Sequence, residues 1–420
     1  MSLNDDKKYI WHPLTQHQLY PDHIVIKKGK GSLLYDENDK KYIDAISSWY
    51  TCMYGHCNSY ITSKVAEQIK QLDHVVFTGF THKPATKLAK ELMSILPENQ
   101  AKLFFSDNGS TSVDIAIKMA LQYHHNNGNK KNTIIAFEDG FHGDTFGAMS
   151  VSGLSIYNGP FEDYFLDVKR IPVPREDNLS DVEDKMTEII NENEVAAFIY
   201  EPLVQGAAGM KMHEADHLNA LLKIAKKHHV LTVADEVMTG FGKTGRFFAS
   251  EHMNELPDIM CLSKSLTGGL VPMAITTCTE SIYNAFLSSK MEKGFFHGHT
   301  YSGNPTSCTA ALASIELLRS DEIQKNIKRI TQKHQEFISR IKEHPKIHQT
   351  RQQGVILALD FNTKTDRYGK LRYRLFDFYM KEGVYLRPLG NTVYILAPYV
   401  ISDEELLTIY NAIEKSFDLI

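Results

Sequence analysis

The sequence predicts an α/β fold, in which a large domain built on a mainly parallel sheet is followed by a smaller α+β domain. From roughly residue 60 to residue 280, strand patterns alternate with helix patterns, which is typical of a parallel sheet covered by helices on both faces. Beyond about residue 304, long helices precede a group of strands. The chain of 420 residues is too long for one simple core, so we expect two or three lobes.

The elements of the large domain follow from the spacing of apolar residues. Apolar side chains at positions 113, 116, 117, 120 and 121 recur at helical spacing, which predicts a helix after Asn108. Short apolar runs bounded by polar residues predict the strands. Further helices are expected over 63–72, 84–96, 181–191 and 216–227, and strands over 102–105, 133–137, 196–200, 231–237, 259–262 and 274–278.

The C-terminal part has a different order of elements. Helices are expected over 306–319 and 322–343, strands near 355–361, 384–388 and 392–396, and a final helix over 403–417. We therefore expect an N-terminal arm (1–60) that joins the small domain, a large domain (61–304) and a C-terminal small domain (305–420).

The composition argues against several classes of protein. A formal charge of −5 argues against nucleic-acid binding, which needs a basic surface. Five cysteines in no paired framework favour a reducing compartment. The polar segment 1–9 has no signal core, and no apolar run is long enough to span a bilayer. We expect a cytoplasmic protein without a nucleic-acid or membrane partner.

Lys264 is the most informative residue. It follows the short strand 259–262, and Asp235 and Val237 lie at the end of the strand before that one. Because strand side chains alternate between faces, Asp235 and Val237 should point the same way. A carboxylate for a pyridine nitrogen, a branched side chain for its face and a lysine for a Schiff base are what a pyridoxal 5′-phosphate (PLP) enzyme needs. Each residue alone could be ordinary, but the combination favours PLP.

Three other segments offer contacts to such a cofactor. Residues 107–112 lie between a strand and a helix, where backbone N–H groups attract an anion, although the same residues suit a plain N-cap. Phe141 could stack on an aromatic ring, and His142 could equally be a core histidine. Thr300 could donate its hydroxyl to a phosphate, or its segment could be a simple turn.

Arg387 stands at the end of an expected strand, where it could bind a substrate carboxylate through two parallel hydrogen bonds. It could also be a surface ion-pair residue. His297, His299 and the segment Cys52–Cys57 lack partners at metal-ligand spacing, so we expect no metal site.

The segment Gly240–Gly245 matches G-x-G-x-x-G directly after a strand, which is half of a dinucleotide fingerprint. The acidic residue of that fingerprint should end the next strand, but Asp258 precedes it. A nicotinamide-dependent dehydrogenase is therefore the weaker hypothesis, from a different class of enzyme.

Together these residues resemble the class III (ω-type) aminotransferases of PLP fold type I. Within that family, the sequence is most similar to the biotin-pathway transaminases that aminate 7-keto-8-aminopelargonate. The resemblance runs from about Trp11 to Tyr399. Its specific stretches are Trp11–Pro13, Ser47–Trp49, Lys118–Tyr123, His142–Ser150, Glu201–Pro202 with Val204–Gly206, and Leu266–Gly269.

The resemblance implies a role for each candidate residue. Lys264 would form the Schiff base with PLP in the large domain, and Asp235 would pair with the ring nitrogen. Thr300 would come from the partner subunit of a homodimer with shared active sites. The remaining cofactor contacts would be Gly109, Ser110, Phe141, His142 and Val237. The substrate channel for an amino donor and a keto acceptor would be formed by Trp49, Tyr50, Phe141, Gly298, Tyr394 and Arg387, of which Arg387 takes the carboxylate.

The sequence departs from the family at four positions. Leu14 and Phe141 stand where the family has tyrosine, Tyr50 replaces a tryptophan, and His299 replaces a proline. Losing two hydroxyls from the substrate side can alter discrimination between substrates. We expect S-adenosylmethionine as the amino donor. Three alternatives remain open. The donor could be lysine, the enzyme could be another class III transaminase that acts on ornithine, 4-aminobutyrate or a diamine, or it could be a PLP aminomutase.

Overall fold

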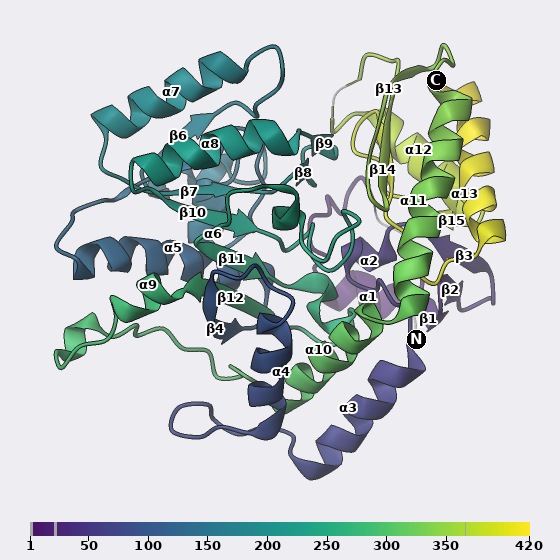
Figure 1. Cartoon of the computed structure of the whole chain (residues 1–420). Coiled ribbons are helices and arrows are strands. Elements are labelled where there is room, and N and C mark those ends of the chain that lie inside the picture. Colours follow the sequence, from purple (N-terminus) through teal and green to yellow (C-terminus); the bar gives the residue numbers. More distant parts are fainter. Residues whose placement is uncertain (1–2, 21–22, 366) are drawn as a thin grey trace.

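The structure is a computed structural model that describes residues 3–20, 23–365 and 367–420 (Figure 1). Its centre is a seven-stranded sheet with the order β4-β12-β11-β10-β7-β5-β6. Only β12 in this sheet runs antiparallel to its neighbours, so the expected mainly parallel α/β sheet is confirmed. The strands are β4 (Gln100–Ser106), β5 (Thr133–Phe137), β6 (Val168–Ile171), β7 (Val195–Tyr200), β10 (Leu231–Asp235), β11 (Ile259–Leu262) and β12 (Ala274–Thr279).

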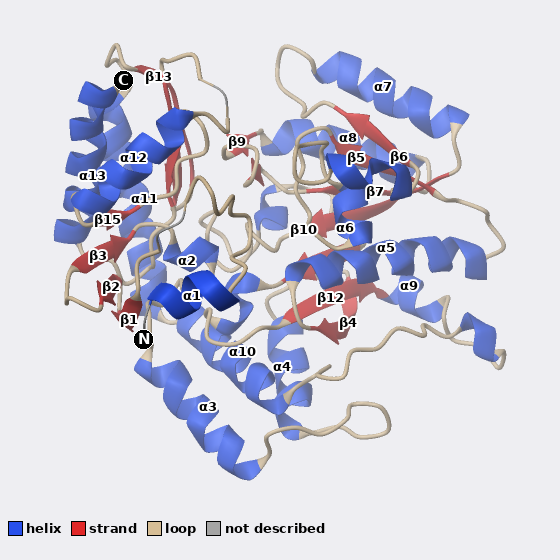
Figure 2. Ribbon diagram, turned by 180° about the vertical axis from the view of Figure 1, so that it is seen from behind, coloured by secondary structure: helices blue, strands red, loops and turns tan. Residues whose placement is uncertain are grey.

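Helices cover both faces of this sheet (Figures 1 and 2). Because side chains alternate along β5, Ile134 and Ala136 pack in the core cluster under α5 (Gly109–Asn126). Ile135 and Phe137 pack in the larger cluster on the opposite face, with residues of α7 (Leu179–Glu192) and α8 (Ala215–Lys227). Burial on both faces explains why these strands read as continuous apolar runs.

Two smaller sheets form the other lobe, which lies on the right of Figure 1. In one, strand β15 from the C-terminal part pairs in parallel with β3 from the N-terminal part, so the two ends of the chain share a sheet. In the other, the order is β13-β14-β16. The strands are β1 (Ile26–Lys30), β2 (Leu33–Asp36), β3 (Lys41–Asp44), β13 (Ile347–Gln353), β14 (Ile356–Phe361), β15 (Val384–Tyr385) and β16 (Thr392–Ile395).

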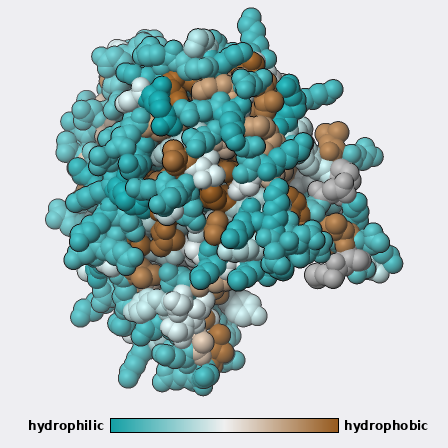
Figure 3. All heavy atoms as spheres, turned by 90° about the vertical axis from the view of Figure 1, so that its right-hand side faces the viewer, coloured by the Kyte–Doolittle hydropathy of each residue, from teal (hydrophilic) through white to brown (hydrophobic). Residues whose placement is uncertain are grey.

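The helices of this lobe complete its core. The long helix α11 (Asp321–Ile341) buries a stripe of apolar side chains that includes Ile323, Ile330 and Phe337. Seen from that side, the surface of the lobe is mainly hydrophilic with scattered apolar side chains (Figure 3). The other α-helices of the described chain are α1 (Leu3–Tyr9), α2 (Ser47–Tyr50), α3 (Ser59–Gln71), α4 (Lys83–Met93), α6 (Phe146–Val151), α9 (Glu280–Asn284), α10 (Pro305–Leu318), α12 (Lys370–Lys381) and α13 (Asp403–Lys415).

Most predicted elements exist, but several ends differ. Helix α3 begins at Ser59 rather than residue 63, because the Asn58 side chain accepts hydrogen bonds from the N–H groups of Tyr60 and Ile61. Strand β10 ends at Asp235, so Val237 lies in the following turn and not on the strand as predicted. Strand β15 has only two residues, so Arg387 lies beyond it.

Several elements of the structure were not predicted from the sequence. Strand β13 carries the polar sequence Ile-His-Gln-Thr-Arg-Gln-Gln, whose backbone pairs with β14 although it lacks an apolar run. Helix α12, strand β6 and the three N-terminal strands were also missed. Within the part of the chain that the structure describes, no helix is both long and apolar enough to cross a bilayer.

The glycine segment 240–245 is not a dinucleotide loop. It is a series of turns, followed by the short 3₁₀ helix Ala249–His252 rather than by an α-helix that could bind a pyrophosphate. Gly242 has a φ of +97°, and a Cβ there would lie 2.9 Å from Ile327 in α11. The segment therefore packs one lobe against the other, which removes the structural basis of the dehydrogenase hypothesis.

Candidate active site

Asp235 and His142 form a buried pair at the carboxyl edge of the large sheet. Asp235 ends β10, and its Oδ2 lies 2.7 Å from Nδ1 of His142. Its Oδ1 accepts the backbone N–H of Val237 at 3.0 Å, which fixes the turn after the strand. His142 was predicted to contact the cofactor or to lie in the core. The structure places it in contact with Asp235.

Glu201 is a buried carboxylate for which no role was predicted from the sequence. It follows β7, next to β10 in the sheet, where Tyr200 pairs with Ala234, so Glu201 and Asp235 leave neighbouring strands at the same edge. Its oxygens accept the backbone N–H groups of Phe141 and Gly206, both at 2.9 Å. Desolvation raises the pKa of Glu201 to about 7. The shared sheet edge is the signal that could have revealed it.

Lys264 begins the 3₁₀ helix η3 (Lys264–Thr267), directly after β11. Its φ is +50°, a backbone conformation that is strained for a residue other than glycine. Desolvation lowers the pKa of Lys264, although the carboxylates of Asp235 and Glu201 act in the opposite direction. Its Nζ lies 5.2 Å from the ring centroid of Tyr50. A lowered pKa favours the neutral form of the lysine that proton transfer from carbon requires.

The start of α5 forms a cradle beside Val237. The Asn108 side chain accepts the N–H of Thr111 at 3.0 Å, so this residue is the predicted N-cap. The N–H groups of Gly109 and Ser110 precede the first intrahelical donor, and they can still bind an anion. A Cβ at Gly109 would lie 2.8 Å from Cγ1 of Val237, so only glycine allows this approach. The N-cap and the anion site can therefore coexist.

Four of the six expected substrate residues are linked by contacts beside Lys264, namely Trp49, Tyr50, Arg387 and Tyr394. The hydroxyl of Tyr50 donates to the hydroxyl of Tyr394 in β16 at 3.0 Å. The guanidinium carbon of Arg387 lies 4.5 Å from the ring centroid of Trp49. Desolvation raises the pKa of Tyr394 to about 12, so this hydroxyl keeps its proton at neutral pH. An apolar wall, two hydroxyls and one cation suit a chain with a carboxylate at one end.

Gly298 and Thr300 are not part of this cluster within one chain. Both are exposed, in the segment between η4 (Met291–Lys293) and α10. Between them in the sequence is His299, whose Nε2 lies 3.4 Å from Oδ2 of Asp107. The segment therefore passes beside the start of α5, where Gly109 and Ser110 form the cradle. Their roles stay predictions.

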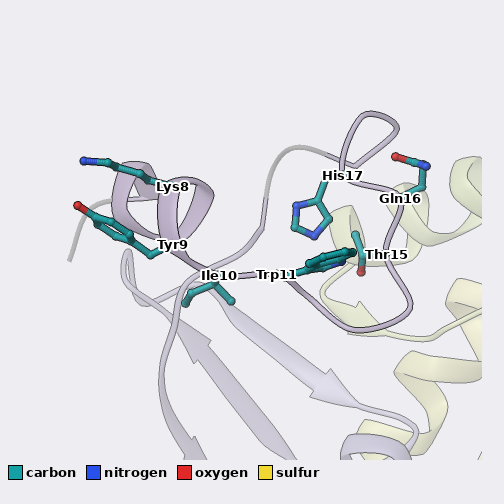
Figure 4. A pocket seen from close by; sticks show the side chains of 7 residues that line it. All are labelled: Lys8, Tyr9, Ile10, Trp11, Thr15, Gln16 and His17. Atoms are coloured by element: carbon teal, nitrogen blue, oxygen red, sulfur yellow. The ribbon is translucent and has the colours of Figure 1, made fainter. Parts of the chain in front are cut away.

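The N-terminal segment carries two exposed residues that bear on the family resemblance, Trp11 and Leu14. Trp11 is 89% exposed and borders a hollow that is lined by residues of the same segment, from Lys8 to Trp11 and from Thr15 to His17 (Figure 4). Leu14 has a φ of +52° and an exposed side chain.

The expectation that no metal is bound stays a prediction. Among the described residues, Asp6, His12 and His23 place possible ligand atoms within 4.8 Å of one another. However, the rings of His12 and His23 are stacked, with 3.8 Å between their centroids and an angle of 17° between their planes. Because ligand lone pairs lie in the ring planes, two nearly parallel rings do not aim at one ion.

The residues of the cluster fit PLP. The anionic Asp235 suits a protonated pyridine nitrogen, the cradle at Gly109 suits a phosphate, and Lys264 suits the carbonyl carbon. Phe141 and Val237 would lie against the ring. When bound, PLP supplies an acceptor for the electrons of a substrate carbanion.

The comparisons with known proteins agree with this geometry. A family model described as aminotransferase class III matches residues 15–417. The chain is 41% identical over 421 residues to the adenosylmethionine-8-amino-7-oxononanoate aminotransferase of Synechococcus elongatus, with 98% of each chain covered.

Two solved structures extend the comparison. The enzyme of the same name from Methanocaldococcus jannaschii matches with a TM-score of 0.94 and 33% identity, over 99% of this chain and 98% of the other. An amine transaminase from an uncultivated Pseudomonas species, in its PLP-bound form, matches with a TM-score of 0.91 and 26% identity over 98% of each chain. The full-length match shows that this chain belongs to the class III aminotransferases, a family of PLP-dependent enzymes.

Proposed function

We propose that this aminotransferase binds PLP and transfers an amino group from S-adenosylmethionine to 8-amino-7-oxononanoate (7-keto-8-aminopelargonate), giving 7,8-diaminononanoate (7,8-diaminopelargonate) for biotin synthesis. The observation that carries the proposal is the cluster of Arg387, Trp49, Tyr50 and Tyr394 beside Lys264. A carboxylate and an aliphatic chain are the features such a cluster would recognise. The identity of the acceptor rests on relatives named for this reaction over nearly their full length.

Each residue has a defined task in this reaction. Lys264 would hold PLP covalently, be displaced by the donor amine, and then move a proton between the donor α-carbon and the cofactor. Asp235, fixed by His142, would keep the pyridine nitrogen protonated. Arg387 would hold the carboxylate of the acceptor through paired hydrogen bonds.

The donor is the least constrained part of the proposal. Leu14 and Phe141 remove two hydroxyls from the substrate side, and Leu14 is exposed in the structure. A site that lacks a hydrogen-bond donor discriminates less strongly between substrates that differ in polar groups. Lysine is therefore the alternative donor, and the amines of other class III enzymes come next.

The decisive experiment is the visible absorption spectrum of the PLP-loaded protein before and after adding S-adenosylmethionine alone. If this compound is the donor, the band of lysine-bound PLP disappears and the band of the aminated cofactor grows. Subsequent 8-amino-7-oxononanoate should restore the first band. Lysine is tested in parallel. If the band changes only with lysine, S-adenosylmethionine is not the donor. If the protein shows no such band after loading, the proposal that it binds PLP is wrong.

A homodimer with shared active sites is part of the proposal. Large apolar side chains are exposed in segments 76–80, 146–164 and 291–301, the last of which contains Thr300. They are Val76, Phe80, Phe146, Ile156, Tyr164, Met291, Phe296 and Tyr301. A second copy would cover this surface and bring Thr300 to the phosphate of its partner. The divisions into an arm (1–60), a large domain (61–304) and a small domain (305–420) are likewise proposed.

A further inference from the structure

The turn Ser47–Tyr50 has an unusual backbone. Ser47, Ser48, Trp49 and Tyr50 have φ values of +50°, +48°, +75° and +71°, and none of them is glycine. A left-handed conformation costs roughly 1–2 kcal/mol per L-residue. Such strain persists only where the surrounding structure enforces it, and it is concentrated at functional sites. The turn carries Trp49 and Tyr50, two of the residues beside Lys264.

The first half of the turn is held by Asp44, the last residue of β3. This carboxylate is fully buried and accepts the backbone N–H groups of Ile46 at 3.2 Å and Ser48 at 2.8 Å. It also accepts the hydroxyl of Ser48 at 3.3 Å. Two backbone N–H groups and one hydroxyl that donate to the same carboxylate explain how the chain enters the left-handed conformation.

His56 balances the charge of Asp44. Its Nε2 lies 2.7 Å from Oδ2 of the carboxylate. Burial alone would lower the pKa of His56, but its contacts with Asp44 and Cys52 raise the pKa to about 10. The imidazole is therefore charged at neutral pH, and the turn is held by a buried ion pair. Removing one partner of such a pair leaves the other charge uncompensated.

The second half of the turn is bound to the active site. The hydroxyl of Ser265, the residue after Lys264, donates to the carbonyl oxygen of Tyr50 at 2.9 Å. At the start of the turn, the hydroxyl of Ser47 donates to the carbonyl oxygen of Leu396, the residue after β16, at 2.7 Å. With both halves fixed, the ring of Trp49 lies against the guanidinium of Arg387.

We propose that Asp44 and His56 are positioning residues: their ion pair maintains the left-handed turn, so that Trp49 orients the Arg387 guanidinium toward the acceptor carboxylate. Neither residue touches the substrate in this scheme. The inference rests on the proposed function for its kinetic consequence, but the position of Trp49 can be measured without any substrate.

The first test uses the fluorescence of Trp49. The chain has two tryptophans, so Trp11→Phe leaves Trp49 alone in the full-length, PLP-loaded protein. Asp44→Asn keeps the shape of the side chain and removes its charge. We expect it to increase acrylamide quenching of Trp49, which is already 41% exposed, by up to about twofold, because the relaxed turn separates the indole from the Arg387 guanidinium that covers part of it. His56→Gln should have the same effect, and unchanged quenching in both variants overturns the inference.

The matched control is Asp36→Asn. Asp36 is also buried in the same small sheet, and it accepts the N–H groups of Asn38 and Lys40 and the hydroxyl of Tyr42. It has no bond to the turn 47–50 among its described contacts. Asp36→Asn should therefore leave the quenching of Trp49 unchanged even if it lowers the melting temperature. If Asp36→Asn increases the quenching of Trp49 as much as Asp44→Asn does, the effect comes from a general destabilisation of the small lobe, and the proposal is wrong.

The second test separates binding from turnover. Asp44→Asn should raise KM for 8-amino-7-oxononanoate about tenfold and change kcat less than about threefold, because only carboxylate positioning is affected. In a protein that already carries Arg387→Gln, Asp44→Asn should raise this KM little further, because the effects of substitutions at coupled residues are not additive. A full tenfold effect in that background overturns the inference. Wild-type protein that does not aminate this acceptor contradicts the proposed function instead, and the fluorescence test then decides alone.

Discussion

The imidazole of His142 and the carboxylate of Asp235 are joined by a 2.7 Å contact in the interior, between residues 93 positions apart in the sequence. The backbone N–H of His142 also donates to the hydroxyl of Ser152 at 2.9 Å, so the residue is held through its backbone as well as through its ring. A carboxylate that must favour a protonated pyridine nitrogen needs a fixed position and a negative charge. The hydrogen bond to His142 fixes the position of the Asp235 carboxylate, and it does not require the carboxylate to give up its charge.

His142→Phe should therefore lower kcat about 10–100-fold, because a buried hydrogen bond to a charged group contributes roughly 1.5–3 kcal/mol. His142→Gln, which can still donate, should recover part of that loss. Steady-state kinetics with saturating substrates measures both variants. Equal rates for the two variants would indicate that the hydrogen bond to Asp235 has no role.

Lys264→Ala should abolish turnover, because no other residue would then carry the proton to and from carbon. The variant should still fold and should lose the visible band of lysine-bound PLP. Lys243→Ala is not a suitable control, because that lysine is itself fully buried between the lobes. Lys223→Ala, on the outer part of α8, is preferable and should retain full activity. Near-normal turnover in Lys264→Ala would contradict the assigned mechanism.

Arg387→Lys should raise KM for the keto acceptor by about 10–100-fold, because lysine keeps the charge but loses the paired hydrogen bonds and the planar contact with Trp49. The band of lysine-bound PLP should be unchanged, since Arg387 does not belong to the cofactor site. Titration of the acceptor at saturating donor measures the effect. An unchanged KM would remove Arg387 from the carboxylate site.

Mixed dimers test the shared active site. Lys264→Ala and Thr300→Ala chains should each be impaired alone. Mixed after refolding or co-expression, they should regain up to about a quarter of the wild-type sites, because half of random dimers are mixed and one of their two sites is intact. No recovery, in samples whose dimers are demonstrated by light scattering, would place Thr300 in the active site of its own chain or in none.

The stability of the small lobe should fall in acid because of His334. This histidine is buried, with Nδ1 2.7 Å from the Tyr410 hydroxyl and Nε2 3.2 Å from the carbonyl oxygen of Val355. Desolvation lowers its pKa to about 4. Since the unfolded chain binds this proton below about pH 6.5, its contribution is complete above that pH and decreases toward pH 4, by about 2 kcal/mol at pH 5.

Urea unfolding at pH 7 and pH 5 measures this loss. His334→Gln should be less stable at pH 7 and should have a weaker dependence on pH than the wild-type protein. His348→Gln, an exposed histidine in β13, serves as the control and should follow the wild type. A parallel pH dependence of His334→Gln and the wild type would assign the acid sensitivity to other groups.

Local patterns were sufficient for the elements of the large sheet. Strands β5 and β11 have the predicted bounds, because apolar runs of four or five residues between polar segments have few other solutions in a parallel sheet. Asp235 and Lys264 were recognisable for the same reason, since Asp235 ends one such strand and Lys264 closely follows the next. Strand β13 was missed because its polar sequence is defined by pairing with β14 and not by its own composition.

The sequence by itself thus determined the α/β class, the family, and the residues at the ends of strands β10 and β11, because all of these depend on short-range order along the chain. Only the tertiary structure decided which distant residues meet: His142 with Asp235, Glu201 beside them, and Tyr50 with Tyr394 across 344 positions. It also decided the left-handed turn at Ser47–Tyr50, which the chain adopts against its local preference. The physical reason is that strand order, crossovers and buried charge pairs are set by long-range packing, and no periodicity in the sequence reports them.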